Sequence, residues 1–166
     1  MNVAIRLRRA FFSTLVDDLA RPHAFAFERV GWVFARQATT HRGPLLLPDW
    51  YEPVNDEDYV RDDKVGARFG TAAIRAALQR ARATNRSCLQ VHLHDHYGDT
   101  QFSWTDCKTI DELATSFRAL VALPHGGLVL SRDSATARIW LPDHDSPSSA
   151  RVTIVGFPTR FGAEHP

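Results

Sequence analysis

The sequence predicts an α/β fold of the α+β kind, in which a mixed β-sheet is packed by about three helices. Stretches with the two-residue alternation of strands take turns with stretches of helical spacing, and the sequence contains no internal repeat. The chain has 166 residues, of which 44% are hydrophobic and 23% charged, and this is enough for one sizeable core. We therefore expect a single domain over residues 1–166, with its core at about 3–155.

The first elements are predicted to be a strand, a helix and a second strand. Residues 3–7 alternate apolar and polar side chains, and residues 10–19 carry apolar side chains at helical spacing up to Arg21-Pro22. Residues 24–35 are dense in aromatic and β-branched side chains, which is typical of a strand. Gly31 inside this stretch predicts a bend or a bulge.

The middle of the chain changes character. Residues 39–68 combine prolines, glycines and many acidic residues with little periodicity. We expect an insertion or irregular segment there, with a short strand around 45–47 and a functional or covering loop. Residues 71–83 are rich in alanine and arginine, and their apolar side chains share one face, which predicts a helix of about three turns.

Residues 88–94 predict a strand that carries two histidines. The leucines and the valine of this stretch share one face, so Gln90, His92 and His94 share the opposite face. The next helix has two candidate starts, Ser103 with Asp106 and Thr109 with Glu112, because both match a capping box. Three further strands are expected, at residues 128–130, 137–141 and 151–155.

The net charge and the cysteine content limit the partners and the compartment that we expect for the protein. The net charge is +1 and the arginines are scattered, so we expect neither a nucleic-acid partner nor an anionic membrane surface. Two cysteines cannot form a disulfide framework, and the N-terminus does not resemble a signal sequence. No apolar run approaches the roughly 20 residues of a spanning helix. The expectation is a soluble, cytoplasmic protein, without a membrane partner.

His92 and His94 have the chemistry and the spacing of a zinc site. Residues i and i+2 of a strand lie about 6.6 Å apart on one face, so both imidazoles can lean onto one ion about 2.0–2.1 Å away. Asp106, on the first turn of a helix that points back at the strand end, is suitably placed as the third ligand. Three protein ligands leave a fourth position for water, whose pKa a catalytic zinc lowers toward about 7. His96 would lie about 13 Å from His92 on a continued strand, too far to share the ion.

Each of these residues also has a simpler explanation. Ser103 and Asp106 could form a helix cap and nothing more, and Glu28 could be an ordinary strand residue, although a carboxylate in so apolar a stretch is costly unless it serves a site. The His-x-His-x-Asp-His signature of metallo-β-lactamase-like hydrolases is missed by one residue and is discounted. The other histidines are expected to be structural or solvated: His23, His41, His125, His144 and His165.

Together these residues resemble the motif of the JAB1/MPN/Mov34 metalloenzyme (JAMM) peptidases. That motif is a glutamate on an early strand, then His-x-His, about seven to ten residues, and Ser-x-x-Asp. Here Glu28 precedes His92 and His94, and eight residues separate His94 from Ser103 and Asp106. The order of predicted elements over residues 3–155 is also similar, which implies the curved mixed sheet of the cytidine deaminase-like JAMM/MPN fold. The chain departs from many eukaryotic members at Asp95-His96, where these have a proline.

The resemblance implies a function. One Zn²⁺ would be held by His92, His94 and Asp106, with Glu28 as general base and Ser103 as the donor to the oxyanion. The implied enzyme is a deubiquitinase-like isopeptidase or peptidase that cleaves after the C-terminal glycine of a ubiquitin-like protein. Residues 50–60 are similar to bacterial members found beside E1-like and E2-like proteins, which makes these further candidate partners. The alternatives are a hydrolase of amino-acid adducts on a sulfur-carrier protein and a non-catalytic MPN-type binding module.

Overall fold

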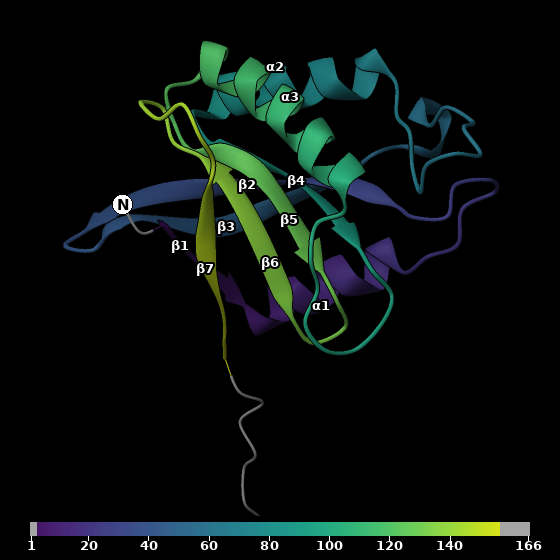
Figure 1. Ribbon diagram of the computed structural model, residues 1–166, viewed down its shortest axis with the longest axis horizontal. Coiled ribbons are helices and arrows are strands. Elements are labelled where there is room, and N and C mark those ends of the chain that lie inside the picture. Colours follow the sequence, from purple (N-terminus) through teal and green to yellow (C-terminus); the bar gives the residue numbers. More distant parts are fainter. Residues whose placement is uncertain (1–2, 157–166) are drawn as a thin grey trace, which may run out of the picture.

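The computed structural model describes residues 3–156. Within these residues seven strands and three α-helices follow one another, with one 3₁₀ turn, η1 (Asp56–Asp58), after the third strand. The elements are β1 (Val3–Arg8), α1 (Arg9–Leu19), β2 (Val30–Thr40), β3 (Gly43–Pro53), α2 (Thr71–Thr84), β4 (Ser87–Leu93), α3 (Trp104–Leu120), β5 (His125–Leu130), β6 (Ala135–Trp140) and β7 (Ser148–Val155). The strands close on themselves in the order β1-β3-β2-β4-β5-β6-β7, with α2 and α3 on one side and α1 on the other (Figure 1).

The predicted fold class is wrong, because the sheet is a closed seven-stranded mixed barrel rather than a curved sheet layered with helices. β1 pairs in parallel with β3 and also with β7, where the register runs from Val3 opposite Ala150 to Arg8 opposite Val155. This pairing joins the first strand to the last and leaves no gap in the ring of strands. The alternation of side chains within a strand predicts which face is buried, but it does not encode the partner strand, so closure was not visible in the sequence.

The start and the irregularity of the second strand also differ from the sequence prediction. The strand expected at 24–35 begins only at Val30, so Glu28 lies just before β2 instead of on it. The register shift in β2 falls between Phe34 and Ala35 and not at Gly31. Phe27 and Ala26 give residues 24–29 an apolar composition, but the N–H groups of Phe27 and Glu28 bond to the Gly66 carbonyl of a loop and not to a neighbouring strand.

Residues 39–68 contain a much longer strand than expected. β3 runs over eleven residues and pairs antiparallel with β2 from Thr40 opposite Gly43 to Gly31 opposite Pro53. The prolines of this stretch argued against a long strand in the sequence, because proline removes a ladder hydrogen bond. β3 meets β1 only at Leu45 and Leu46, so the rest of the strand has a single partner and tolerates proline.

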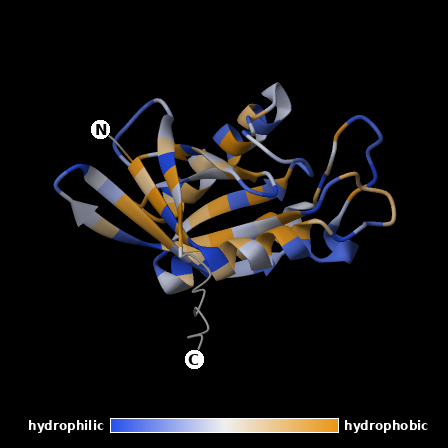
Figure 2. Ribbon diagram, turned by 90° about the horizontal axis from the view of Figure 1, so that it is seen from below, coloured by the Kyte–Doolittle hydropathy of each residue, from blue (hydrophilic) through white to orange (hydrophobic). Residues whose placement is uncertain are grey.

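The hydrophobic core is divided by the barrel wall. One cluster joins α1, through Phe12 and Leu15, to the inward faces of the strands, and a second joins α2 and α3 to Trp32 and Phe34 of β2. Figure 2 shows hydrophobic residues along the strands and hydrophilic ones in the connecting loops. α3 approaches β5 very closely, since a Cβ at Gly127 would collide with the side chain of Ile110. This close packing fixes the helix that carries Ser103 and Asp106.

Two of the remaining histidines make structural contacts, as the sequence analysis expected. His125 is fully buried at the start of β5, and His23 Nδ1 accepts hydrogen bonds from the backbone N–H groups of Phe25 and Ala26. His165 lies outside the described residues. Across residues 3–156, no helix is both long enough and apolar enough to cross a membrane.

The buried His125 should make stability depend on pH. Its Nδ1 accepts from the Cys88 N–H at 3.0 Å and its Nε2–H donates to the Val121 carbonyl at 3.1 Å, so the ring is held neutral. Burial lowers the pKa of His125 from 6.5 to about 4. The unfolded chain therefore binds the extra proton between these values, and about 3 kcal/mol of stability, present above pH 6.5, is lost as the pH falls to 4.

Urea unfolding at a series of pH values, with EDTA present, measures this effect. A His125→Gln variant keeps one acceptor and one donor without a titrating group, so its free energy of unfolding should lack this component. Equal pH dependence in both proteins would contradict the prediction.

Candidate metal centre

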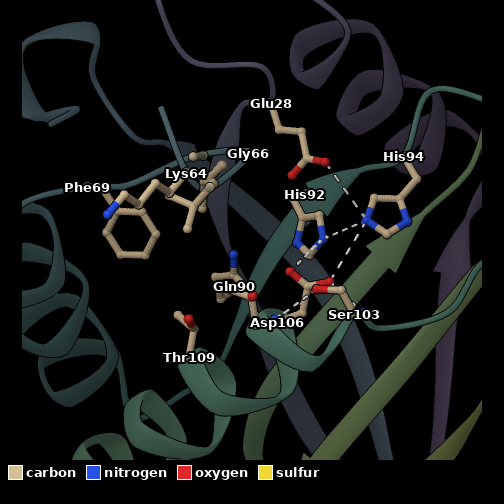
Figure 3. Close-up of a pocket in the computed structure, with 14 residues that line it drawn as sticks. Glu28, Lys64, Gly66, Phe69, Gln90, His92, His94, Ser103, Asp106 and Thr109 are labelled. Atoms are coloured by element: carbon tan, nitrogen blue, oxygen red, sulfur yellow. Dashed lines mark hydrogen bonds and ion pairs between the residues drawn. The ribbon is translucent and has the colours of Figure 1, made fainter. Parts of the chain in front are cut away.

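The two histidines of β4 converge on one point. His92 lies within the strand and His94 directly follows it, with its backbone N–H bonded to the Leu130 carbonyl at 2.9 Å. The Nε2 atoms of the two rings are 3.2 Å apart (Figure 3). Two ligands held about 2.0–2.1 Å from a tetrahedral ion are separated by about 3.3 Å, so this spacing fits two ligands of one metal.

Two carboxylates approach the histidine pair from opposite sides (Figure 3). Asp106 Oδ1 lies 3.5 Å from His92 Nε2, and Asp106 Oδ2 lies 3.9 Å from His94 Nε2. Glu28 Oε1 lies 4.0 Å from His94 Nε2. Asp106 is thus within 4.0 Å of both rings, and Glu28 is that close to one ring only.

These groups could hold a metal ion. Glu28, His92 and His94 each offer a ligand atom within 4.8 Å of the other two. All five residues singled out in the sequence line one cavity of about 220 Å³: Glu28, His92, His94, Ser103 and Asp106. The structure therefore brings together residues that come from three separate parts of the chain.

Asp106 is held in place by the start of α3. Ser103 is the N-cap, its Oγ accepts the Asp106 N–H at 3.1 Å, and Asp106 Oδ2 accepts the Ser103 N–H at 2.7 Å. The first of the two predicted helix starts is therefore the real one. The Asp106 carboxylate can cap the helix and face the histidines at once, because Oδ2 takes part in the cap and Oδ1 faces His92.

The charge states of these groups suit a cation. Burial by itself raises the pKa of Asp106, but hydrogen bonds with His92 and Ser103 outweigh this effect and lower the pKa to about 2. Burial, together with the neighbouring His92, lowers the pKa of His94. An ionised carboxylate and a neutral imidazole are the forms that bind metal.

Thr100 orients His94, a contact that no sequence pattern indicated. Its Oγ1 lies 3.2 Å from His94 Nδ1, and the side chain is almost fully buried. A hydrogen bond at Nδ1 fixes the ring so that Nε2 faces the cavity. Thr100 lies in the loop between β4 and α3, where no periodicity indicates which residue points inward.

The same loop explains the place of His96. Its Nδ1 lies 2.9 Å from the carbonyl oxygen of the adjacent Tyr97, and the side chain is exposed. An ion pair between Asp95 and Arg132, at 2.9 Å, holds the loop against the β5–β6 hairpin. His96 therefore lies on an exposed loop, with its ring centroid 6.3 Å from that of His94, and not on a continued strand as the spacing argument assumed.

Gln90 and Gly66 complete the walls of the cavity. Gln90 lies on the same face of β4 as the histidines and is nearly buried, and the two-residue period had placed it there. Gly66 approaches Glu28 from the loop after β3. No sequence pattern connects Gly66 with Glu28.

Comparison with known proteins adds no family to this description. No protein-family profile matches the chain, and no curated protein has a significantly similar sequence. The resemblance to the JAMM peptidases therefore rests on the motif residues of the sequence, and the closed barrel departs from the fold that the resemblance implied.

Asp106 should contribute more to metal binding than Glu28. Asp106→Asn removes the carboxylate that faces both rings, and we expect it to weaken metal affinity by more than the roughly 10–100-fold that supporting residues cost. Glu28→Gln should change the affinity less. Titration of the metal-free protein with Co²⁺, followed by visible absorption, measures both constants, and the reverse order would assign Glu28 as the ligand.

Thr100→Val should weaken metal binding through His94 alone. The substitution keeps the shape of the side chain but removes the oxygen beside Nδ1, so we expect a roughly 10–100-fold loss in affinity. Thr115→Val, on the exposed face of α3, serves as the matched control. Unchanged Co²⁺ affinity in Thr100→Val would show that the ring is oriented by other contacts.

Proposed function

We propose that the chain is a zinc-dependent isopeptidase or peptidase of the JAMM type, which cleaves after the C-terminus of a ubiquitin-like protein. The convergence of Glu28, His92, His94, Ser103 and Asp106 in one cavity supports the proposal most directly. Residues joined only by a chance sequence pattern would have no reason to meet.

Zinc is the metal that these donors suit best. Two imidazole nitrogens and one carboxylate form a ligand set typical of catalytic zinc. The two Nε2 atoms, 3.2 Å apart, have the spacing of tetrahedral ligands, while Asp106, at 3.5 Å from His92 and 3.9 Å from His94, would have to move slightly inward to bind the ion. His92, His94 and Asp106 would hold the ion, which when bound supplies a Lewis acid and a water of lowered pKa. Because three protein ligands leave one position open, the arrangement favours catalysis over a purely structural role.

Glu28 would carry the proton. Its carboxylate lies across the histidine pair from Asp106 and opens into the same cavity. There it can accept a proton from the attacking water and deliver it to the amine that leaves when the C–N bond breaks. The amine departs neutral, and the carboxylate returns to its starting state.

Ser103 would stabilise the oxyanion. Its Oγ accepts the Asp106 N–H, and this leaves the hydroxyl hydrogen free to donate into the cavity that Ser103 also lines. The cap already positions the Ser103 hydroxyl, so little further ordering is needed when negative charge develops on the substrate oxygen.

The size of the cavity favours a slender substrate. At about 220 Å³ the space around the histidine pair is smaller than the roughly 300–1,000 Å³ typical of small-molecule sites, and it shares Phe69 and Thr109 with a neighbouring pocket of about 680 Å³. A glycine tail, which has no side chains, fits such a space, and this agrees with the ubiquitin-like substrates that the motif implies. E1-like and E2-like proteins of the same system are further proposed partners.

Glu28→Gln should abolish cleavage while zinc stays bound. The amide keeps the shape of the side chain but cannot accept the proton, so we expect a loss of roughly 10²–10⁴-fold in kcat. The measurements are cleavage of ubiquitin-like fusions that end in glycine and zinc content by mass spectrometry. Glu57→Gln, at an exposed site on η1, is the matched control and should retain full activity.

Full activity of Glu28→Gln would remove the assigned role. A folded wild-type protein that takes up no zinc would defeat the enzyme proposal and leave the MPN-type binding module. Zinc binding with no cleavage of any ubiquitin-like fusion, but with release of an amino acid from a sulfur-carrier protein, would favour the adduct hydrolase.

A further inference from the structure

Glu28 lies on no helix or strand, so another part of the chain has to hold it. The loop over residues 54–70, here called the covering segment, supplies that support. The Gly66 carbonyl accepts two backbone hydrogen bonds, from Phe27 N–H at 2.8 Å and from Glu28 N–H at 3.1 Å. The backbone of Glu28 is thereby held by the covering segment.

The two residues after Glu28 are bound by the same segment. The almost buried Arg29 donates to both carboxylate oxygens of Asp56, at 2.7 and 3.3 Å. The Val30 N–H donates to the Tyr59 hydroxyl at 2.7 Å, and the Val30 carbonyl accepts the Val54 N–H at 3.0 Å. Positions 27–30 are therefore each anchored to the covering segment.

The covering segment has internal structure of its own. Val60 N–H bonds to the Arg68 carbonyl and Gly70 N–H to the Asp58 carbonyl, both at 2.8 Å. Arg68 also pairs with Asp62 at 3.0 Å. These contacts close the segment into a compact loop, which can support Glu28.

Gly66 meets the Glu28 side chain as well as its backbone. A Cβ at residue 66 would lie 2.7 Å from Glu28 Oε2 and 2.8 Å from Glu28 Cδ, closer than real contacts allow. Gly66 does not have a positive φ, so space and not backbone strain requires glycine there. Because the obstructed atoms are the far end of a flexible side chain, a larger residue would move the carboxylate without unfolding the loop.

We propose that Gly66 is a positioning residue, which holds the Glu28 carboxylate over the histidine pair and links the covering segment to proton transfer. The inference rests on the proposed function, because it takes Glu28 as the proton carrier. The carbonyl of Gly66 holds the backbone of Glu28 by a hydrogen bond. The absence of a side chain at Gly66 leaves the space that the Glu28 carboxylate occupies.

Gly66→Ala tests the inference on the zinc-loaded, full-length protein. A displacement of roughly 1 Å can cost on the order of 10²-fold, so we expect kcat to fall by about that factor while KM and zinc content stay unchanged. Gly70→Ala is the matched control, since a Cβ there meets nothing closer than 3.5 Å and its φ of −80° suits alanine. Wild-type kcat in Gly66→Ala would overturn the inference.

A double-mutant cycle with Glu28→Asp separates positioning from general damage. Aspartate withdraws the carboxylate by one methylene, which removes its contact with an added methyl group at residue 66. If Gly66 acts through Glu28, Gly66→Ala should reduce kcat by no more than about threefold in the Glu28→Asp background. An equally large loss in both backgrounds would mean a structural effect and would contradict the proposal.

A crystal structure of Gly66→Ala provides a readout that does not depend on activity. The inference expects intact β2, β4 and α3, unchanged His92 and His94, and a carboxylate of Glu28 displaced from its wild-type position. An unmoved carboxylate overturns the inference even if the enzyme proposal holds. If the wild-type protein cleaves nothing, the enzyme proposal fails, and the displacement of Glu28 alone decides whether Gly66 positions it.

Discussion

The pairing of β4 with its two neighbours places every part of the candidate metal centre. β2 runs antiparallel to β4 with Val30 opposite His92, so the residues just before β2 meet the end of β4. β5 runs parallel to β4 with Val129 opposite His92. A parallel pair needs a crossover, and here the crossover helix α3 begins at the same end of the strand. One strand end therefore gathers Glu28 from one side and Asp106 from the other.

The site combines groups of very different rigidity. His92 and Asp106 belong to a central strand and to a helix that packs closely on β5 through Ile110 and Gly127. Glu28 lies on a loop, and its position depends on a second loop, the covering segment. Ligands on rigid elements keep a metal geometry constant, and loops open more readily than packed elements. Under the proposed function, movement of the covering segment would displace Glu28, the proposed proton carrier, before it displaced His92 or Asp106.

The sequence predicted correctly those strands and helices in which apolar side chains recur at the strand or helix period without interruption. The strand that bears the histidines, the helix at 71–83 and the capping box at Ser103 are confirmed within a residue or two. The strand expected at 24–35 begins late, because residues 24–29 are apolar yet bond to a loop. β3 was underestimated, because its prolines lie where the strand has only one partner. In both cases tertiary contacts outweighed local composition.

The sequence by itself determined which chemical groups are available and which of them share a strand face or a helix turn. A shared face for His92 and His94 and a capping box for Ser103 and Asp106, as one of two candidate helix starts, could be predicted, since both relations depend on backbone periods over a few residues. Only the tertiary structure decided that the sheet closes through β1 and β7, that Glu28 reaches the histidines, and that Thr100 and Gly66 support the site. Those contacts join residues distant along the chain, and they follow from strand partners and loop paths that no local period specifies.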